Sequence, residues 1–136
     1  MHPTSTEIAA RIEELYGAPL AELHAWAQDH PPGMLAALLA MHESLADAER
    51  SITFHRERLA QLIHPERKIT GFEVSHLLDG TRRLAEAVAV RDTQSVSTAA
   101  VVHSLAPSRP RPAEPVPDPL TPPVARSATP SAAPSR

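Results

Sequence analysis

The chain has 136 residues, a formal net charge of −3 at pH 7 and no cysteine. This length suffices for one small domain, and the lack of cysteine excludes disulfides, thiolate metal sites and cysteine nucleophiles. Only one Trp, one Tyr and two Phe occur among 42% hydrophobic residues. The core must therefore consist of aliphatic side chains, which suit helix packing better than a β-sandwich. Composition predicts an all-α fold.

Charge and hydropathy also limit the kinds of partner and the cellular location that we expect. Residues 1–105 carry nine Lys or Arg against fourteen Asp or Glu, and an acidic body argues against a protein that lives on nucleic acid. Residues 1–15 lack the apolar core of a signal peptide. The longest unbroken apolar run, residues 34–41, is far shorter than the roughly 20 residues that a bilayer span needs. We therefore expect a cytoplasmic protein with no membrane partner.

Two short helices are predicted at the N-terminus. Thr4 and Glu7 have the spacing of a capping box, and the apolar residues that follow recur on one helical face. Gly17 is suited to end this helix, and a second amphipathic segment reaches about residue 29. The His-Pro-Pro-Gly sequence of residues 30–33 then stops the second helix, because a Pro pair with a Gly cannot continue it.

A heptad pattern over about residues 33–63 predicts one long helix. Its apolar positions alternate at spacings of four and three, as in the seam of a helix that packs lengthwise on another. Residues 34–41 are apolar on most sides, so we expect the two N-terminal helices to cover that end. The predicted seam residues of this helix are Leu38, Met41, Leu45, Ile52, His55, Leu59 and Leu62.

A second long helix is predicted over about residues 71–92. Thr70 and Glu73 again form a capping-box signal, and the connection of about six residues makes the two long helices antiparallel neighbours. Because this helix is shorter than the first, residues 96–105 are expected to form a separate, weak helix over the rest of the seam. The predicted seam residues on this side are Val74, Leu77, Leu84 and Val88.

The composition changes at residue 106, since ten of the last 31 residues are Pro. We predict a helical domain over residues 1–105 and a disordered, proline-rich tail over residues 106–136. In the tail, Arg109, Pro112 and Pro115 match the Arg-x-x-Pro-x-x-Pro form that docks on aromatic grooves. Chance also explains such a match in a tail so rich in Pro.

No catalytic, cofactor or metal site is predicted. Gly-rich phosphate loops and nucleophile elbows are absent from the sequence. Glu73-x-x-His76 occurs once, whereas a di-metal bundle needs that motif twice, and His42 lies roughly 20 Å from His55 along one helix. We interpret His55 as a partly buried seam residue with one hydrogen-bond partner, either Thr81 across the seam or a backbone carbonyl. The alternative is a polar residue that sets helix register or oligomeric state.

These features predict a non-enzymatic helical module for protein interaction or oligomerisation, with a regulatory or adaptor role. Its partner would be another protein or a second copy, as in a homodimer, and no small-molecule substrate is inferred. The alternative is an accessory transcriptional or nucleic-acid-associated regulator that contacts phosphate through a basic end, although acidic residues interleave there. The candidate phosphate contacts are Arg56, Arg58, Arg67, Lys68, Arg82 and Arg83.

Overall fold

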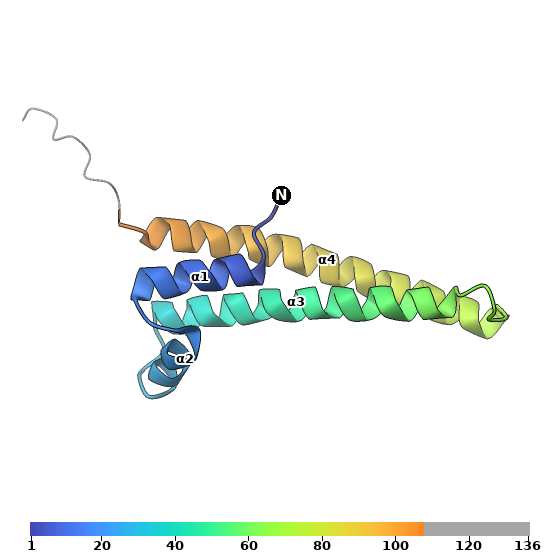
Figure 1. Ribbon diagram of the computed structural model, residues 1–136, viewed down its shortest axis with the longest axis horizontal. Coiled ribbons are helices and arrows are strands. Elements are labelled where there is room, and N and C mark those ends of the chain that lie inside the picture. The colour runs from blue at the N-terminus through green and yellow to red at the C-terminus, as the bar shows by residue number, and fades with distance from the viewer. Residues whose placement is uncertain (108–136) are drawn as a thin grey trace, which may run out of the picture.

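A computed structural model describes residues 1–107, and every regular element in that range is a helix. The helices are α1 (Ser5–Tyr16), α2 (Leu20–Gln28), α3 (Met34–Leu62) and α4 (Gly71–Leu105). The last two form a long antiparallel hairpin, α1 lies along one half of it, and α2 crosses its end (Figure 1). The predicted all-α antiparallel bundle is therefore confirmed. The predicted disordered tail, from residue 108 onward, lies outside the described residues.

The ends of the helices carry the caps that the sequence predicts. At α1, the backbone N–H of Thr4 donates to the Glu7 carboxylate at 2.7 Å, and the Glu7 N–H donates to the Thr4 hydroxyl at 3.3 Å. Gly17 ends this helix in the left-handed region, at φ 68°, where a side chain is disfavoured. At α4, the Thr70 N–H donates to the Glu73 carboxylate at 3.0 Å. Local sequence thus sets where both helices begin.

Helix α4 continues well beyond its predicted end, to a length of 35 residues. The expectation of a separate helix over residues 96–105 was wrong, because neither Pro nor Gly interrupts the chain between residues 81 and 106. Ser95 and Thr98 in this stretch have modest helix propensity, yet both are fully buried in the helix. Tertiary packing therefore overrides their modest helix propensity.

The hydrophobic core lies in the half of the hairpin that α1 and α2 cover. We call this half the base; it comprises α1, α2 and residues 34–49 and 91–105, and we call residues 50–90 the tip. The prediction that the N-terminal helices cover residues 34–41 is confirmed by the core cluster, which all four helices supply. The cluster consists of Ile8, Ile12, Leu23, Leu35, Leu38, Leu39, Leu45 and Val102.

Polar contacts fix the start of α1 on the hairpin. The Ser5 N–H donates to Oε1 of Glu49 at 2.9 Å, and Nε2 of His42 donates to the Ser5 carbonyl at 3.0 Å. From α4, the Ser95 hydroxyl donates to the Pro3 carbonyl at 2.5 Å. His42 is buried, and its Nδ1 has no hydrogen-bond partner within residues 1–107. α1 begins at these contacts and runs from there toward α2 (Figure 1). Within residues 1–107, therefore, no third helix covers the tip.

Candidate interaction surface

The predicted seam is enclosed in the base and partly exposed in the tip. Leu38 and Leu45 have no exposed surface, and Met41 is partly exposed. Among the seam residues of the tip, only Leu62 is buried. Val74, in the first turn of α4, is 44% exposed. The seam residues with intermediate exposure in the tip are Ile52, His55, Leu59, Leu77, Leu84 and Val88.

The two helices of the tip approach each other closely at Gly80. A Cβ atom built on Gly80 would lie 3.1 Å from Cδ2 of Leu59, so the glycine admits this leucine into the seam. The Thr81 hydroxyl, one of the two expected partners of His55, donates to the Leu77 carbonyl at 2.8 Å. The His55 ring instead meets the edge of Phe54, with the ring centroids 5.2 Å apart.

Large apolar side chains remain exposed over the tip. Phe72 is 72% exposed and Leu78 is 68% exposed, although each lies on a well-formed helix. Single exposed apolar residues are ordinary on protein surfaces, whereas large contiguous apolar patches are typical of interaction sites. The members of this group are Phe54, Ile63, Ile69, Phe72, Val74 and Leu78.

One edge of α3 runs through both halves. Leu35, His42, Glu49, Arg56 and Ile63 follow one another at seven-residue steps, so they line one side of the helix. In the base this edge is covered, since Leu35 is in the core and both His42 and Glu49 form hydrogen bonds with Ser5 of α1. In the tip the same edge is bare, and Ile63 is 58% exposed. The edge of α3 that α1 covers in the base is therefore exposed in the tip.

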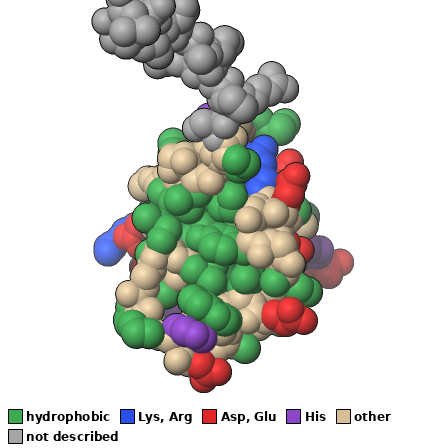
Figure 2. All heavy atoms as spheres, turned by 90° about the vertical axis from the view of Figure 1, so that its left-hand side faces the viewer, with side chains coloured by type: hydrophobic (Ala, Val, Ile, Leu, Met, Phe, Trp, Pro, Cys, Tyr) green, Lys and Arg blue, Asp and Glu red, His purple; other side chains and the backbone are tan. Residues whose placement is uncertain are grey.

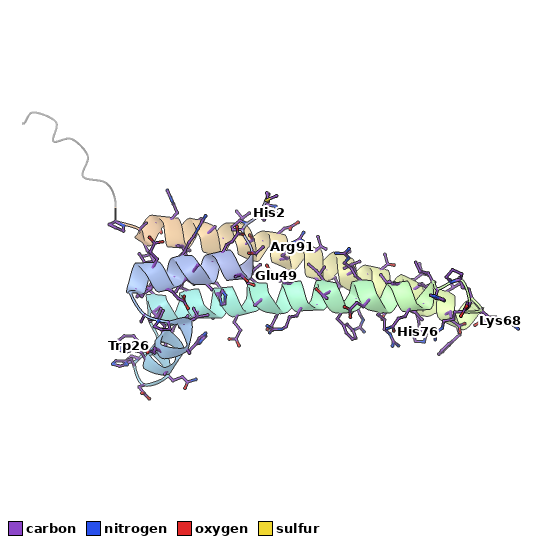
Figure 3. The ribbon with its side chains drawn as sticks, viewed as in Figure 1. His2, Trp26, Glu49, Lys68, His76 and Arg91 are labelled. Carbon is purple, nitrogen blue, oxygen red and sulfur yellow. The ribbon has the colours of Figure 1, made fainter. Side chains whose placement is uncertain are left out.

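The candidate phosphate contacts do not converge on one site. Arg56 and Arg58 are two positions apart, which places them about 200° apart around α3. On α4, Arg82 pairs with Glu86 at 3.1 Å and Arg83 pairs with Asp79 at 2.9 Å. Lys68 lies at the far end of the molecule in the turn between the helices, and Arg67 precedes it there (Figure 3). Because some of these cations pair with acids and others point in different directions, they do not form one positively charged surface.

The histidines of the hairpin are engaged in separate local contacts. His76 projects from the outer side of the tip, and its ring meets the edge of Phe72 at a centroid distance of 4.4 Å (Figure 3). Glu73, which shares its motif, is held in the cap of α4. In residues 1–107, no three His, Asp or Glu side chains come together in a way that would hold a metal ion.

An apolar pocket opens at the opposite end of the molecule, which sequence patterning had not singled out. Its volume is about 570 Å³, and it lies between α1, α2 and the start of α3. Trp26 is 52% exposed at its wall, Tyr16 is 37% exposed, and Glu22 is the charged residue of the lining. The Trp26 ring stacks on His30 at 3.8 Å. Figure 2 shows hydrophobic side chains gathered over this end of the molecule.

Sequence periodicity missed this pocket because a repeating apolar pattern marks one side of a helix and does not show where the ends of several helices leave a cavity. Met34 is 56% exposed and lines the pocket. The signal that could have found the site is the nearness of a Trp to the chain break at residues 30–33. The predicted docking residues of the tail, Arg109, Pro112 and Pro115, lie outside the described residues.

No protein-family model, curated protein or solved structure matches this chain. Function must therefore be argued from the surfaces themselves. Over residues 1–107, none of the helices combines the length and the apolar character that crossing a membrane requires.

Proposed function

We propose that this chain is a non-enzymatic helical module that acts by association, and that the tip of the α3–α4 hairpin is its association surface. The observation that carries the proposal is the partial exposure of a regular heptad seam. Residues such as Ile52 and Leu84 occupy seam positions, yet only two helices surround them. In helical bundles, a third or fourth helix normally covers the apolar seam between two packed helices.

The amount of exposed apolar surface supports association. Six large apolar side chains between residues 54 and 78 are 44% exposed or more. At on the order of 100 Å² each, they offer roughly 600 Å² before the partly exposed seam is counted. A stable interface buries about 800 Å² on each partner. Phe54 and Ile63 lie nine positions apart, on nearly opposite sides of α3, so a single interface would combine part of this area with the partly exposed seam. Enclosing one such side chain stabilises an assembly by about 1.5–3 kcal/mol.

A second copy of the chain is the partner that we favour. Two tips packed antiparallel would form a four-helix bundle from their two hairpins, and the interface would be isologous. Net charge does not oppose this pairing, because residues 50–90 hold seven Lys or Arg against five Asp or Glu. The base could not pair with itself as easily, since Arg11 is the one basic residue against eight acidic ones in residues 1–49.

The alternative of a nucleic-acid-associated regulator has less support. It needs several cations on one face, whereas Arg56 and Arg58 point to different sides of α3 and Arg83 is paired with an acid. A titration of labelled DNA across a salt series separates the two functions. The association module leaves the DNA unbound at physiological salt, and the regulator binds with an affinity that falls steeply as salt is added.

Sedimentation and thermal melting over a hundredfold range of protein concentration test the proposal. We expect a dimer whose melting temperature rises with concentration. Replacing Ile63 and Leu78 together by Glu should give a folded monomer, because both side chains are already exposed in the single chain. The matched control is Val96→Glu, a change at a 53% exposed position of α4 in the base, which should leave the dimer intact.

A monomer mass throughout, with a melting temperature independent of concentration, would show that the tip does not self-associate. Dimerisation that survives in the Ile63 and Leu78 variant but fails in Val96→Glu would move the interface to the base.

A further inference from the structure

The pocket at the base end is the strongest site that the proposed function leaves unused. It lies at the opposite end from the tip, so the proposed association does not occupy it. Its lining is apolar apart from Glu22, and two aromatic side chains stand partly exposed at its wall. Pockets with this composition bind apolar ligands that present a few polar groups.

We propose that this pocket binds a proline-rich, arginine-bearing segment, and that its occupant is residues 109–115 of the same chain. Pro rings pack on the flat faces of Trp and Tyr, and extended Pro-rich segments lose little conformational entropy on binding. The stacking of Trp26 on His30 holds the indole in place, which lowers the cost of binding further. Arg109, Pro112 and Pro115 carry the matching ligand chemistry.

The place where α4 ends makes the chain's own tail the natural occupant. Leu105 packs on the same core cluster as Leu20 and Ala27 of α2, so α4 ends at the end of the molecule where the pocket opens. At about 3.1 Å per residue in an extended form, Pro112 reaches about 16 Å from Pro107 and Pro115 about 25 Å. α4 does not contact α2, and both helices pack on α1 and α3. The path from the end of α4 to α2 therefore covers about two interhelical spacings of 8–10 Å, or about 16–20 Å, which lies within the reach of Pro115.

Charge favours the same pairing. Residues 5–29 hold Arg11 against five acidic residues, and Glu22 stands in the pocket lining. Residues 106–136 hold four Arg against Glu114 and Asp118. An Arg next to Glu22 would therefore meet an acidic surface, and the attraction would weaken as salt screens it beyond about 8 Å.

Trp26 is the single Trp of the chain, so its fluorescence reports on the pocket alone. The test compares three full-length proteins: the wild type, a variant with Arg109, Pro112 and Pro115 replaced by Ala, and a matched control with Arg126, Pro130 and Pro134 replaced by Ala. We expect the first variant to shift emission to longer wavelength and to raise acrylamide quenching about twofold. The control should behave as the wild type does. Glu22→Gln should give an intermediate result.

Far-UV circular dichroism checks that all variants keep their helices, and the indole N–H resonance of Trp26 gives a second readout that does not depend on quenching. Identical quenching and indole shifts in all three proteins would overturn the proposal. It would also be overturned if Trp26 became more shielded with rising protein concentration regardless of the tail substitutions, because a second copy would then be the occupant. The tip variant with Glu at residues 63 and 78 should leave Trp26 unchanged, so this inference and the proposed function can fail separately.

Discussion

The base and the tip of the hairpin are built from the same two helices with the same heptad pattern, yet they differ in how completely the seam is buried. Leu45 and Leu59 occupy equivalent seam positions two heptads apart. Leu45 has no exposed surface, whereas Leu59 is partly exposed beside Gly80. The difference arises from α1, which covers Leu45 and does not extend as far as Leu59. A heptad pattern therefore specifies pairing between helices, and a third element decides enclosure.

The length of α1 explains why only one half is covered. A helix of 12 residues is about 18 Å long, whereas the 29 residues of α3 extend over about 44 Å. Contacts of Ser5 with Glu49 and His42 fix where the helix begins, so it cannot slide toward the tip. The comparison between the halves can be tested by substitutions made in matched pairs.

The largest difference is expected from truncating the equivalent leucines. Leu45→Ala should lower the free energy of unfolding by about 2–5 kcal/mol, because it leaves a cavity in a closed core. Leu59→Ala should cost about half as much or less at low protein concentration, since solvent already reaches this side chain. Urea denaturation of both variants at a concentration that favours the monomer measures the two values. Equal losses would mean that the tip is as enclosed as the base.

A smaller effect is expected from the polar anchor of α1. Glu49→Ala removes the acceptor of the Ser5 N–H and should cost about 1–3 kcal/mol, as for other partly buried hydrogen-bonded groups. Glu57→Ala, at an exposed position of the tip, is the control and should stay within about 0.5 kcal/mol of the wild type. Amide hydrogen exchange should show faster exchange in α1 of the first variant. Unchanged protection there would show that apolar contacts alone hold α1.

Gly80 gives a sharper measure of how tightly the tip is packed. Alanine gains up to about 1 kcal/mol in helix propensity, and its Cβ would press on the end of the Leu59 side chain. Because that side chain is partly exposed it can move aside, so Gly80→Ala should raise the melting temperature slightly. Gly80→Val, with two further methyl groups, should lower it. A clear loss of stability in the alanine variant would indicate a seam too tight to adjust.

The smallest effect concerns the caps in the two halves. Hydrogen bonds from the Thr70 side chain and backbone hold the pKa of Glu73 below its usual range, and those from Thr4 lower the pKa of Glu7 in the same way. A lowered folded pKa gives stability that is present above the unfolded value, near 4.3, and is lost as pH falls through the folded pKa. Glu73→Gln and Glu7→Gln should therefore melt below the wild type at pH 7, and the difference should shrink toward pH 3. A difference that stays constant with pH would exclude the carboxylate as its source.

Short-range sequence signals determined much of this fold. Both capping boxes, the stop at Gly17 and the break at residues 30–33 follow from the backbone preferences and spacing of neighbouring residues, and the structure has all of them. The heptad spacing marks the apolar side of each long helix. These signals could not predict how far each residue is buried.

Tertiary structure alone decided the features on which the functional proposals depend. Helix α4 runs on through Ser95 and Thr98 because α1 and α3 bury them, which no local propensity encodes. Trp26 stands at a pocket and Ile63 on a bare edge because of where α1 begins and ends. Burial is a property of neighbours that are distant in the sequence, so a periodic pattern marks the apolar side of a helix but leaves open what, if anything, covers it.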